Sequence, residues 1–280
     1  MAATTCRGID QARITQPHNN YSWRIAMHVA RTVVCKTFLN AIVLSLLGTA
    51  LLGASTARVQ VADSPTEVAR KTDLAGLATL SGEWTIVNGE KGTASVRDGV
   101  LRIAPAPRTN LFHSPDDGFI VVNAPMVLFA PEGDFTFKAK VSAQLVNVYD
   151  VAALVAYADG KHWAKLCFEN SALEEATVVT VVTRERSDDA NSENVASPFV
   201  YLAIARKGDE YSMHFSRDGK QWRLARHFQL PAEPKLRIGF AAHSDSNQFV
   251  ASFSEIVYRP TAPPNMRQLN SADLDFPGVR

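Results

Sequence analysis

Residues 84–258 form a succession of short β-strand patterns separated by turn signals, and this constrains the fold more than any other feature. Apolar and polar residues alternate along segments such as His162–Glu169 and Glu210–Arg217, as in strands whose successive side chains face opposite sides of a sheet. Asp-Gly pairs that begin at positions 98, 159 and 218 are typical of hairpin turns. We therefore predict an all-β fold, a two-sheet antiparallel jelly-roll sandwich, in one domain over residues 80–259.

The first 57 residues do not continue this pattern. They carry five basic residues and one acidic residue, and an apolar run from Phe38 to Ala54 ends just before small residues that include Ala57. This order indicates a secretory signal peptide cleaved after Ala57, and hence a secreted or periplasmic protein. The alternative is an uncleaved membrane anchor, because the run is at the short end of what spans a bilayer. The start of translation, at Met1 or Met27, stays open.

Loss of this leader would change the cysteine content of the chain. Cys6 and Cys35 lie within it, so the mature protein would keep Cys167 alone and could form no internal disulfide. The whole chain holds 29 basic and 28 acidic residues. This balance argues against a nucleic-acid-binding protein, which normally carries a basic excess. Between the leader and the tail, residues 58–79 are predicted to be a linker, and residues 260–280 a Pro-rich polar tail.

One face of the predicted sheet mixes aromatic and charged side chains. Adjacent strand rows are expected to place on it Tyr157, Trp163, Lys165, Glu169, Arg184 and His214. Aromatic rings can stack on the C–H faces of a sugar, while charged groups bond to its hydroxyls, so this face is a candidate carbohydrate-binding site. The alternative is that these residues only form surface ion pairs, which contribute little to stability.

The residues of the central strands resemble a known family. The segments concerned are Tyr149-Asp150-Val-Ala-Ala-Leu-Val-Ala-Tyr157, Trp163-Ala-Lys165-Leu-Cys-Phe-Glu169, Val178-Val-Thr-Val-Val-Thr183, Ser187-Asp188 and Ser216-Arg-Asp218-Gly219-Lys-Gln-Trp222. They are similar to the regulation-of-enolase-like family (domain of unknown function 1349) of the concanavalin A-like lectin/glucanase superfamily. The resemblance covers roughly residues 80–258 and implies a jelly-roll sandwich with no established reaction. Two further matching motifs add Asn110 and Asn123 to the candidate ligand-binding residues.

Two other functions compete with non-catalytic carbohydrate binding. A glycoside hydrolase or polysaccharide lyase would need two carboxylates at one bond, and the candidates are Glu169 with Asp150 or Asp188. A protein-interaction or regulatory module is the second alternative, which the family name suggests. These three functions are not separated by the sequence.

No cofactor is predicted. The histidines lack zinc-ligand spacing. A structural calcium ion held by loop acids at Asp116, Asp117, Asp188 and Asp189 has no defined ligand pattern behind it. The expected partner is a carbohydrate or glycan, with no nucleic acid, and with a membrane contacted only through an uncleaved signal segment.

Overall fold

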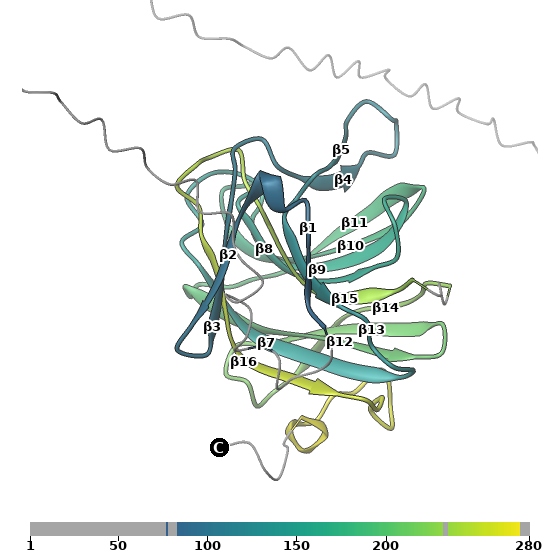
Figure 1. Ribbon diagram of the computed structural model, residues 1–280. Helices are drawn as coiled ribbons and strands as arrows, with labels where there is room; N and C mark the ends of the chain where they lie inside the picture. Colours follow the sequence, from purple (N-terminus) through teal and green to yellow (C-terminus); the bar gives the residue numbers. More distant parts are fainter. Residues whose placement is uncertain (1–76, 78–82, 232–234, 275–280) are drawn as a thin grey trace, which may run out of the picture. The chain divides into compact units, whose positions relative to one another are not determined.

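The computed structural model describes residue 77 and residues 83–231 and 235–274 (Figure 1). The predicted leader at residues 1–57 lies outside the described residues, as does the predicted linker apart from Leu77. In the described part of the chain, no helix is both long and apolar enough to cross a membrane.

Sixteen strands and two short 3₁₀ turns make up the regular structure of the described residues. In chain order, they are β1 (Thr85–Val87), η2 (Gly89–Lys91), β2 (Gly92–Arg97), β3 (Val100–Pro105), β4 (Leu111–His113), β5 (Ile120–Val122), β6 (Met126–Phe129), β7 (Phe135–Ala143), β8 (Val151–Tyr157), β9 (His162–Asn170), β10 (Ala176–Arg184), β11 (Arg186–Asn194), β12 (Phe199–Lys207), β13 (Glu210–Ser216), β14 (Arg223–Gln229), β15 (Arg237–His243), β16 (Ala251–Arg259) and η3 (Ser271–Asp273).

The strands form two seven-stranded antiparallel sheets packed face to face, which confirms the predicted jelly-roll sandwich. Sheet A has the order β1-β6-β15-β8-β9-β10-β11, and sheet B has the order β14-β13-β12-β7-β16-β3-β2. The remaining two strands, β4 and β5, pair only with each other. Figure 1 shows this hairpin on the side of sheet A that faces away from sheet B.

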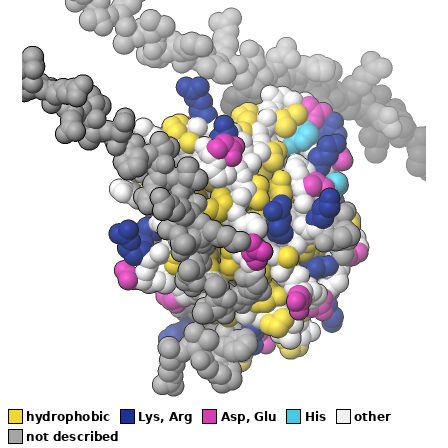
Figure 2. Space-filling view, viewed as in Figure 1, with side chains coloured by type: hydrophobic (Ala, Val, Ile, Leu, Met, Phe, Trp, Pro, Cys, Tyr) yellow, Lys and Arg dark blue, Asp and Glu magenta, His cyan; other side chains and the backbone are white. Residues whose placement is uncertain are grey.

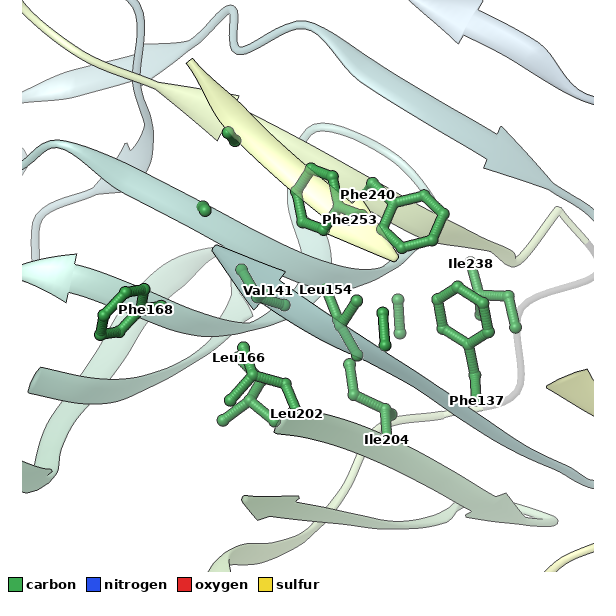
Figure 3. Close-up of a cluster of buried hydrophobic side chains, with 14 of the residues drawn as sticks. Phe137, Val141, Leu154, Leu166, Phe168, Leu202, Ile204, Ile238, Phe240 and Phe253 are labelled. Atoms are coloured by element: carbon green, nitrogen blue, oxygen red, sulfur yellow. The ribbon is translucent and has the colours of Figure 1, made fainter. Parts of the chain in front are cut away.

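The main hydrophobic core lies between the two sheets. Sheet A contributes Leu154, Leu166 and Phe240, and sheet B contributes Phe137 and Leu202, all of them fully buried (Figure 3). The predicted alternation of β9 is confirmed, because Ala164, Leu166 and Phe168 belong to this core. Aromatic contacts join the sheets, with Phe240 4.6 Å from Phe253 between ring centroids. Burial of so much apolar surface supplies the main driving force for a fold that has one free cysteine among its described residues.

The outer face of sheet A is buried as well. Every residue of β8 is buried, and alternate residues of β8, β9 and β10 form a second apolar cluster that includes Val155, Cys167 and Val179. The β4–β5 hairpin lies over this cluster through Leu111 and Phe112. Sheet A is therefore covered on both sides, which explains why β8 and much of β10 are apolar on both rows.

Residues 260–274 pack against the outer face of sheet B, which corrects the prediction of a polar tail over this part of the chain. Met266, Leu269 and Leu274 are buried, and the two leucines form a small apolar cluster with Ala203 of β12. The prediction was wrong because these three apolar side chains are spaced among prolines and polar residues, so no strand or helix periodicity marks them.

Asp188 and Asp189 lie in the strand β11, which corrects the prediction that they are loop residues. It is an edge strand that pairs with β10 alone, and most of its side chains are exposed. A strand with little buried surface shows no apolar alternation, so its polar sequence resembled a loop.

The close approach of β15 to β6 requires a glycine at position 239. A Cβ atom built on Gly239, which has φ of +156°, would lie 2.1 Å from the carbonyl oxygen of Val127. We expect Gly239→Ala to lower the free energy of unfolding by about 2–4 kcal/mol, because the backbones of two paired strands would have to separate. Urea denaturation measures this change.

The control for this variant is Gly99→Ala in the β2–β3 turn, where φ is +72° but nothing lies within 4 Å of an added Cβ. Its cost is expected to be about 1 kcal/mol, from backbone strain alone. Equal losses in the two variants would contradict the assignment of the Gly239 effect to strand contact.

Candidate functional site

A pocket opens on the outer face of sheet A, beside the β4–β5 hairpin. Its cavity volume is about 600 Å³. The charged and polar residues that line it are Arg108, Thr109, Asn110, Lys165, Glu169, Asp189, His243 and Asp245. Its apolar and aromatic lining consists of Phe112, Phe119, Val121, Tyr149, Val179 and Val181. Such a concave site, apolar with a few polar groups converging on it, has the form of a small-ligand pocket.

Three strands of sheet A position the buried polar residues of the pocket. Lys165 and Glu169 lie on the same row of β9, four residues apart. Val151 of β8 pairs with both Glu169 and His243 of β15, so these two side chains flank it in one cross-strand row. Lys165 reaches toward that row, and its Nζ lies 3.0 Å from Nε2 of His243. The antiparallel register therefore brings together residues that are 78 positions apart in the sequence.

The contact between Lys165 and His243 is a hydrogen bond from an ammonium group to a neutral imidazole. Burial lowers the pKa of His243 well below its usual value, and the neighbouring charge of Lys165 lowers it further. Nε2 of the neutral ring therefore accepts a hydrogen bond from Lys165, which places the ring proton on Nδ1. Lys165 is only 3% exposed, and its Nζ also lies 6.0 Å from the centre of the Trp163 ring.

Lys165 is a buried cation without a bound counterion. Within residues 83–231 and 235–274, no carboxylate lies within ion-pair distance of its Nζ, and His243 is its one hydrogen-bond partner. Burying a charge without pairing it costs several kcal/mol. The fold bears this cost at a position that lines the pocket.

Glu169 is the buried acid of the site, with 9% of its surface exposed. Burial raises the pKa of its carboxyl group, the charge of Lys165 opposes this shift, and the charge of Asp189 adds to it. A carboxyl group of this kind holds its proton to a higher pH than an exposed glutamate does. It can accept a hydrogen bond from a ligand hydroxyl when ionised, or donate one when protonated.

The rim of the pocket is exposed and carries charges of both signs together with two aromatic rings. Arg108, Asp189 and Asp245 are exposed, as are Phe119 and Tyr149. Charged side chains of both signs are also scattered over the molecular face seen in Figure 2, so surface charge alone does not indicate a partner on that face.

Tyr149 at the rim has a strained backbone. Its φ is +65°, in the left-handed region that few residues other than glycine and asparagine adopt, and 48% of its surface is exposed. The loop is held in place by Asp150, whose carboxylate accepts hydrogen bonds from the backbone N–H groups of Val146 and Asn147 and from the hydroxyl of Ser244. Strain that neighbouring contacts maintain is often found at functional sites.

The structure brings four of the predicted face residues onto the outer face of sheet A, although not all of them reach the pocket. Tyr157 pairs with Trp163, and these two share the outer face of sheet A with Lys165 and Glu169. Lys165 and Glu169 line the pocket. Trp163 is 0% exposed, because it lies in the apolar cluster that the hairpin covers, so it presents no ring face for a sugar to stack on.

Arg184 and His214 do not lie on this face, so their predicted placement was wrong. Arg184 belongs to the opposite row of β10, and its Nη1 donates to the carbonyl of Gln229 in sheet B. His214 lies on β13 of sheet B, where it pairs with Ala203 and is buried, and this burial lowers its pKa to about 4. The alternation of one strand does not reveal which sheet a distant strand joins.

The two acids proposed as partners of Glu169 lie outside the pocket. Asp150 is buried and bonded to its own loop and to Ser244. Asp188 pairs with Val182, on the row that faces sheet B, and forms an ion pair of 2.9 Å with Arg226. Its neighbour Asp189 pairs with Val181 instead and lines the pocket.

The two asparagines have different positions at the site. Asn110 lines the pocket, and its backbone N–H donates to Oδ1 of Asn123 at 2.8 Å. Asn123 also donates from Nδ2 to the carbonyl of Arg108 at 3.3 Å. It therefore orders the segment that carries Asn110 and Arg108, and it is not itself part of the pocket lining.

Five residues that line the pocket are not among the predicted ligand-binding residues: His243, Asp189, Tyr149, Arg108 and Asp245. A signal existed for His243, since Ile238, Phe240 and Ala242 form an inner row and place position 243 on the outer row. The register that sets it in the same cross-strand row as Glu169, on the other side of Val151, had no signal in the sequence.

No metal site is found in the described part of the chain, where no three or more His, Cys, Asp or Glu residues are grouped to hold an ion. Asp116 and Asp117, named as possible calcium ligands, are bonded within their own surroundings. Asp116 accepts from Ser114 and Gly118, and Asp117 from His113 and Arg186.

Fold and site together define a jelly-roll β-sandwich with a pocket on the outer face of one sheet. The chain belongs to the family described as "Protein of unknown function (DUF1349)", whose model matches residues 86–261. No curated protein matches the chain. These findings do not bear on enolase regulation, which stays a prediction.

Solved structures share the fold at low sequence identity. A functionally unknown protein from Saccharomyces cerevisiae has a TM-score of 0.58 and 20% identity, and the match covers 65% of this chain and 97% of that one. The GH43 protein BlXynB from Bacillus licheniformis has a TM-score of 0.50 and 17% identity, over 59% of this chain and 34% of that one. A xylan β-1,4-xylosidase from Bacillus halodurans C-125 has a TM-score of 0.50 and 16% identity, over the same shares. The chain thus corresponds to about a third of each Bacillus protein, and these likenesses establish the fold alone.

The unpaired charge of Lys165 leads to a prediction about stability. Lys165→Met keeps a long side chain but removes the buried charge, so we expect the free energy of unfolding to rise by about 1–3 kcal/mol. Chemical denaturation measures the change. The control is Lys161→Met, since Lys161 forms an exposed ion pair with Glu185, and its effect should stay within about 0.5 kcal/mol. A loss of stability in Lys165→Met would show that the ammonium group is compensated in the folded protein.

The raised pKa of Glu169 predicts a pH-dependent stability. The folded protein binds this proton more tightly than the unfolded chain, so the free energy of unfolding falls as pH rises from the ordinary pKa of 4.5 through the raised pKa of the folded state. Glu169→Gln lacks this titration, so its stability relative to the wild type should be greater at pH 7 than at pH 4. Thermal or urea unfolding at the two pH values tests this.

Glu185→Gln is the matched control for the pH experiment. Glu185 is exposed, and its hydrogen bond from Lys161 lowers its pKa, so the relative stability of this variant should change with pH in the opposite direction. The charged or titratable groups that line the same pocket as Glu169 are Arg108, Tyr149, Lys165, Asp189, His243 and Asp245. A relative stability of Glu169→Gln that does not depend on pH would contradict the burial of its charge.

Proposed function

We propose that this protein is an exported, non-catalytic carbohydrate-binding β-sandwich whose ligand occupies the pocket on the outer face of sheet A. The observation that carries the proposal is the composition of this pocket. Buried hydrogen-bonding groups, Lys165, Glu169 and His243, form its inner wall, and aromatic rings stand at its rim.

The chemistry of a sugar ring matches this arrangement. Its hydroxyls both donate and accept hydrogen bonds, and its C–H faces pack against aromatic rings. Lys165 supplies donors, and the carboxyl oxygens of Glu169 and Asp189 supply acceptors. Phe112, Phe119 and Tyr149 supply ring surfaces. The volume of about 600 Å³ is within the range of small-ligand pockets and leaves room for a saccharide.

Binding is favoured over hydrolysis because of where the acids lie. The hydrolase alternative needed Glu169 beside Asp150 or Asp188, and neither of these acids lines the pocket. Glu169 and Asp189 both line the pocket, but they do not lie opposite each other. Glu169 pairs with Thr177 of β10, and Asp189 pairs with Val181, four residues further along the same strand. The two Bacillus structures that share the fold include a xylan β-1,4-xylosidase, so xylan and its oligosaccharides belong in the test panel.

Export is supported by the sequence at the N-terminus. The apolar run from Phe38 to Ala54, with basic residues before it and small residues after it, has the order of a secretory signal. N-terminal sequencing of the protein recovered from its native host tests cleavage after Ala57.

The binding proposal is tested by calorimetry and affinity electrophoresis against a panel of mono-, oligo- and polysaccharides. Tyr149→Gly is the diagnostic variant, because it removes the rim aromatic and also relieves the left-handed strain. We expect about tenfold weaker binding, without loss of stability.

Glu174→Gly is the matched control, because Glu174 also has a positive φ, of 59°, but does not line the pocket. Its saccharide affinity should equal that of the wild type. Failure of the wild type to bind any member of the panel would overturn the proposal. Release of reducing ends from a bound polysaccharide would replace non-catalytic binding with hydrolysis.

A further inference from the structure

The pocket has an uneven distribution of charge. Lys165 is buried, with 3% of its surface exposed, whereas Asp189, Asp245 and Arg108 are exposed at the rim, where water screens their charges. The other two buried ionisable groups of the pocket are Glu169 and His243. Burial disfavours the negative charge of Glu169 and raises its pKa. The inner wall around Lys165 and His243 is therefore the positive part of the pocket.

The coordination of the Lys165 ammonium group is incomplete. It has three N–H donors, and one of them is directed to Nε2 of His243 at 3.0 Å. His243 is neutral and brings no negative charge to the contact. In the described part of the chain, no carboxylate lies at ion-pair distance. The group thus has donor capacity left and lacks a counterion.

We propose that the natural ligand is an acidic saccharide, a sugar ring bearing a carboxylate, whose carboxylate pairs with Lys165 in the pocket. This inference rests on the proposed carbohydrate-binding function and adds the chemical class of the ligand. In the complex, the ligand carboxylate accepts the free N–H bonds of Lys165, while Glu169 and Asp189 bond to ring hydroxyls.

A carboxylate fits this position better than a hydroxyl for an electrostatic reason. A ligand that fills the pocket removes the remaining water from Lys165, so the cost of the buried charge rises. A hydroxyl supplies an acceptor but no charge, whereas a carboxylate supplies both and forms a charge-assisted bond about twice as strong. The three acids of the pocket do not prevent this, because two are exposed and the third has a raised pKa.

His243 serves as a positioning residue in this arrangement. Its neutral ring accepts one hydrogen bond and thereby fixes the direction of the ammonium group without neutralising it. A carboxylate at the place of His243 would have satisfied Lys165 within the protein. The choice of a buried imidazole leaves the positive charge available to a ligand.

The experiment compares sugars that differ only in the acidic group. Calorimetry with the full chain measures the affinities for glucuronate against glucose, galacturonate against galactose, and oligogalacturonate against its methyl ester. In the pair whose sugar ring the pocket recognises, we expect the acidic member to bind at least about tenfold more tightly than the neutral member at low salt. This preference should disappear in Lys165→Met and persist in the control variant Lys161→Met.

The outcomes separate this inference from the proposed function. Equal or tighter binding of the neutral sugars would overturn the acidic ligand and leave carbohydrate binding intact. Binding of no saccharide at all would overturn both. Acetate that binds as tightly as the uronate would show an anion site without sugar recognition, and a sulfated sugar that binds better than the uronate would overturn the carboxylate.

The wild-type comparison alone decides the inference, so it does not depend on the folding of any variant. His243→Gln gives an additional readout for the positioning role. This variant should reduce the affinity for the acidic sugar more than it reduces the affinity for the neutral sugar. An equal reduction of both affinities would remove His243 from the recognition of the carboxylate.

Discussion

The double burial of sheet A determines the rest of this structure. Its inner face packs against sheet B, and the outer row of β8, β9 and β10 is also apolar, so this row must be covered. The chain meets this need with a short hairpin, β4–β5, and the segments on either side of it. This cover packs against the apolar cluster that includes Trp163 and Cys167. The pocket lies against this cover, between Phe112 and Val121 of the hairpin and the buried polar residues Lys165, Glu169 and His243 of sheet A.

The change from apolar to polar can be followed along β9. Trp163 is enclosed beneath the cover, whereas Lys165 and Glu169, two and six residues further on, line the pocket. Cys167, which shares their row, is buried, and burial raises the pKa of its thiol to about 12, so it stays protonated and chemically quiet. A single strand row therefore supplies both the support of the hairpin and the polar wall of the site. This sharing places the site on the central strands of sheet A.

The sequence was informative where burial produces a pattern. The alternation in β9 correctly separated the core residues Ala164, Leu166 and Phe168 from the opposite row, and the turn signals correctly indicated an antiparallel sandwich. It was uninformative where burial is slight or irregular. Edge strand β11 lacked alternation, so Asp188 was predicted to be the partner of Glu169, whereas its neighbour Asp189 lines the pocket. Arg184 and His214 were misplaced because row and sheet membership depend on register and topology, which are properties of pairs of strands.

Lys165 illustrates how a functional requirement can be distinguished from a structural one. Residues that only stabilise a fold have their charges paired or exposed, as Arg226 with Asp188 and Lys161 with Glu185. Lys165 is buried, bonded to a neutral ring, and directed toward a cavity. Because an apolar residue of similar length would cost the fold less, stability does not account for this lysine. The same reasoning applies to Tyr149, whose strained backbone places an exposed ring at the rim of that cavity. Two independent costs to the folded state converge on one pocket, and a ligand that relieves the charge and contacts the ring accounts for both.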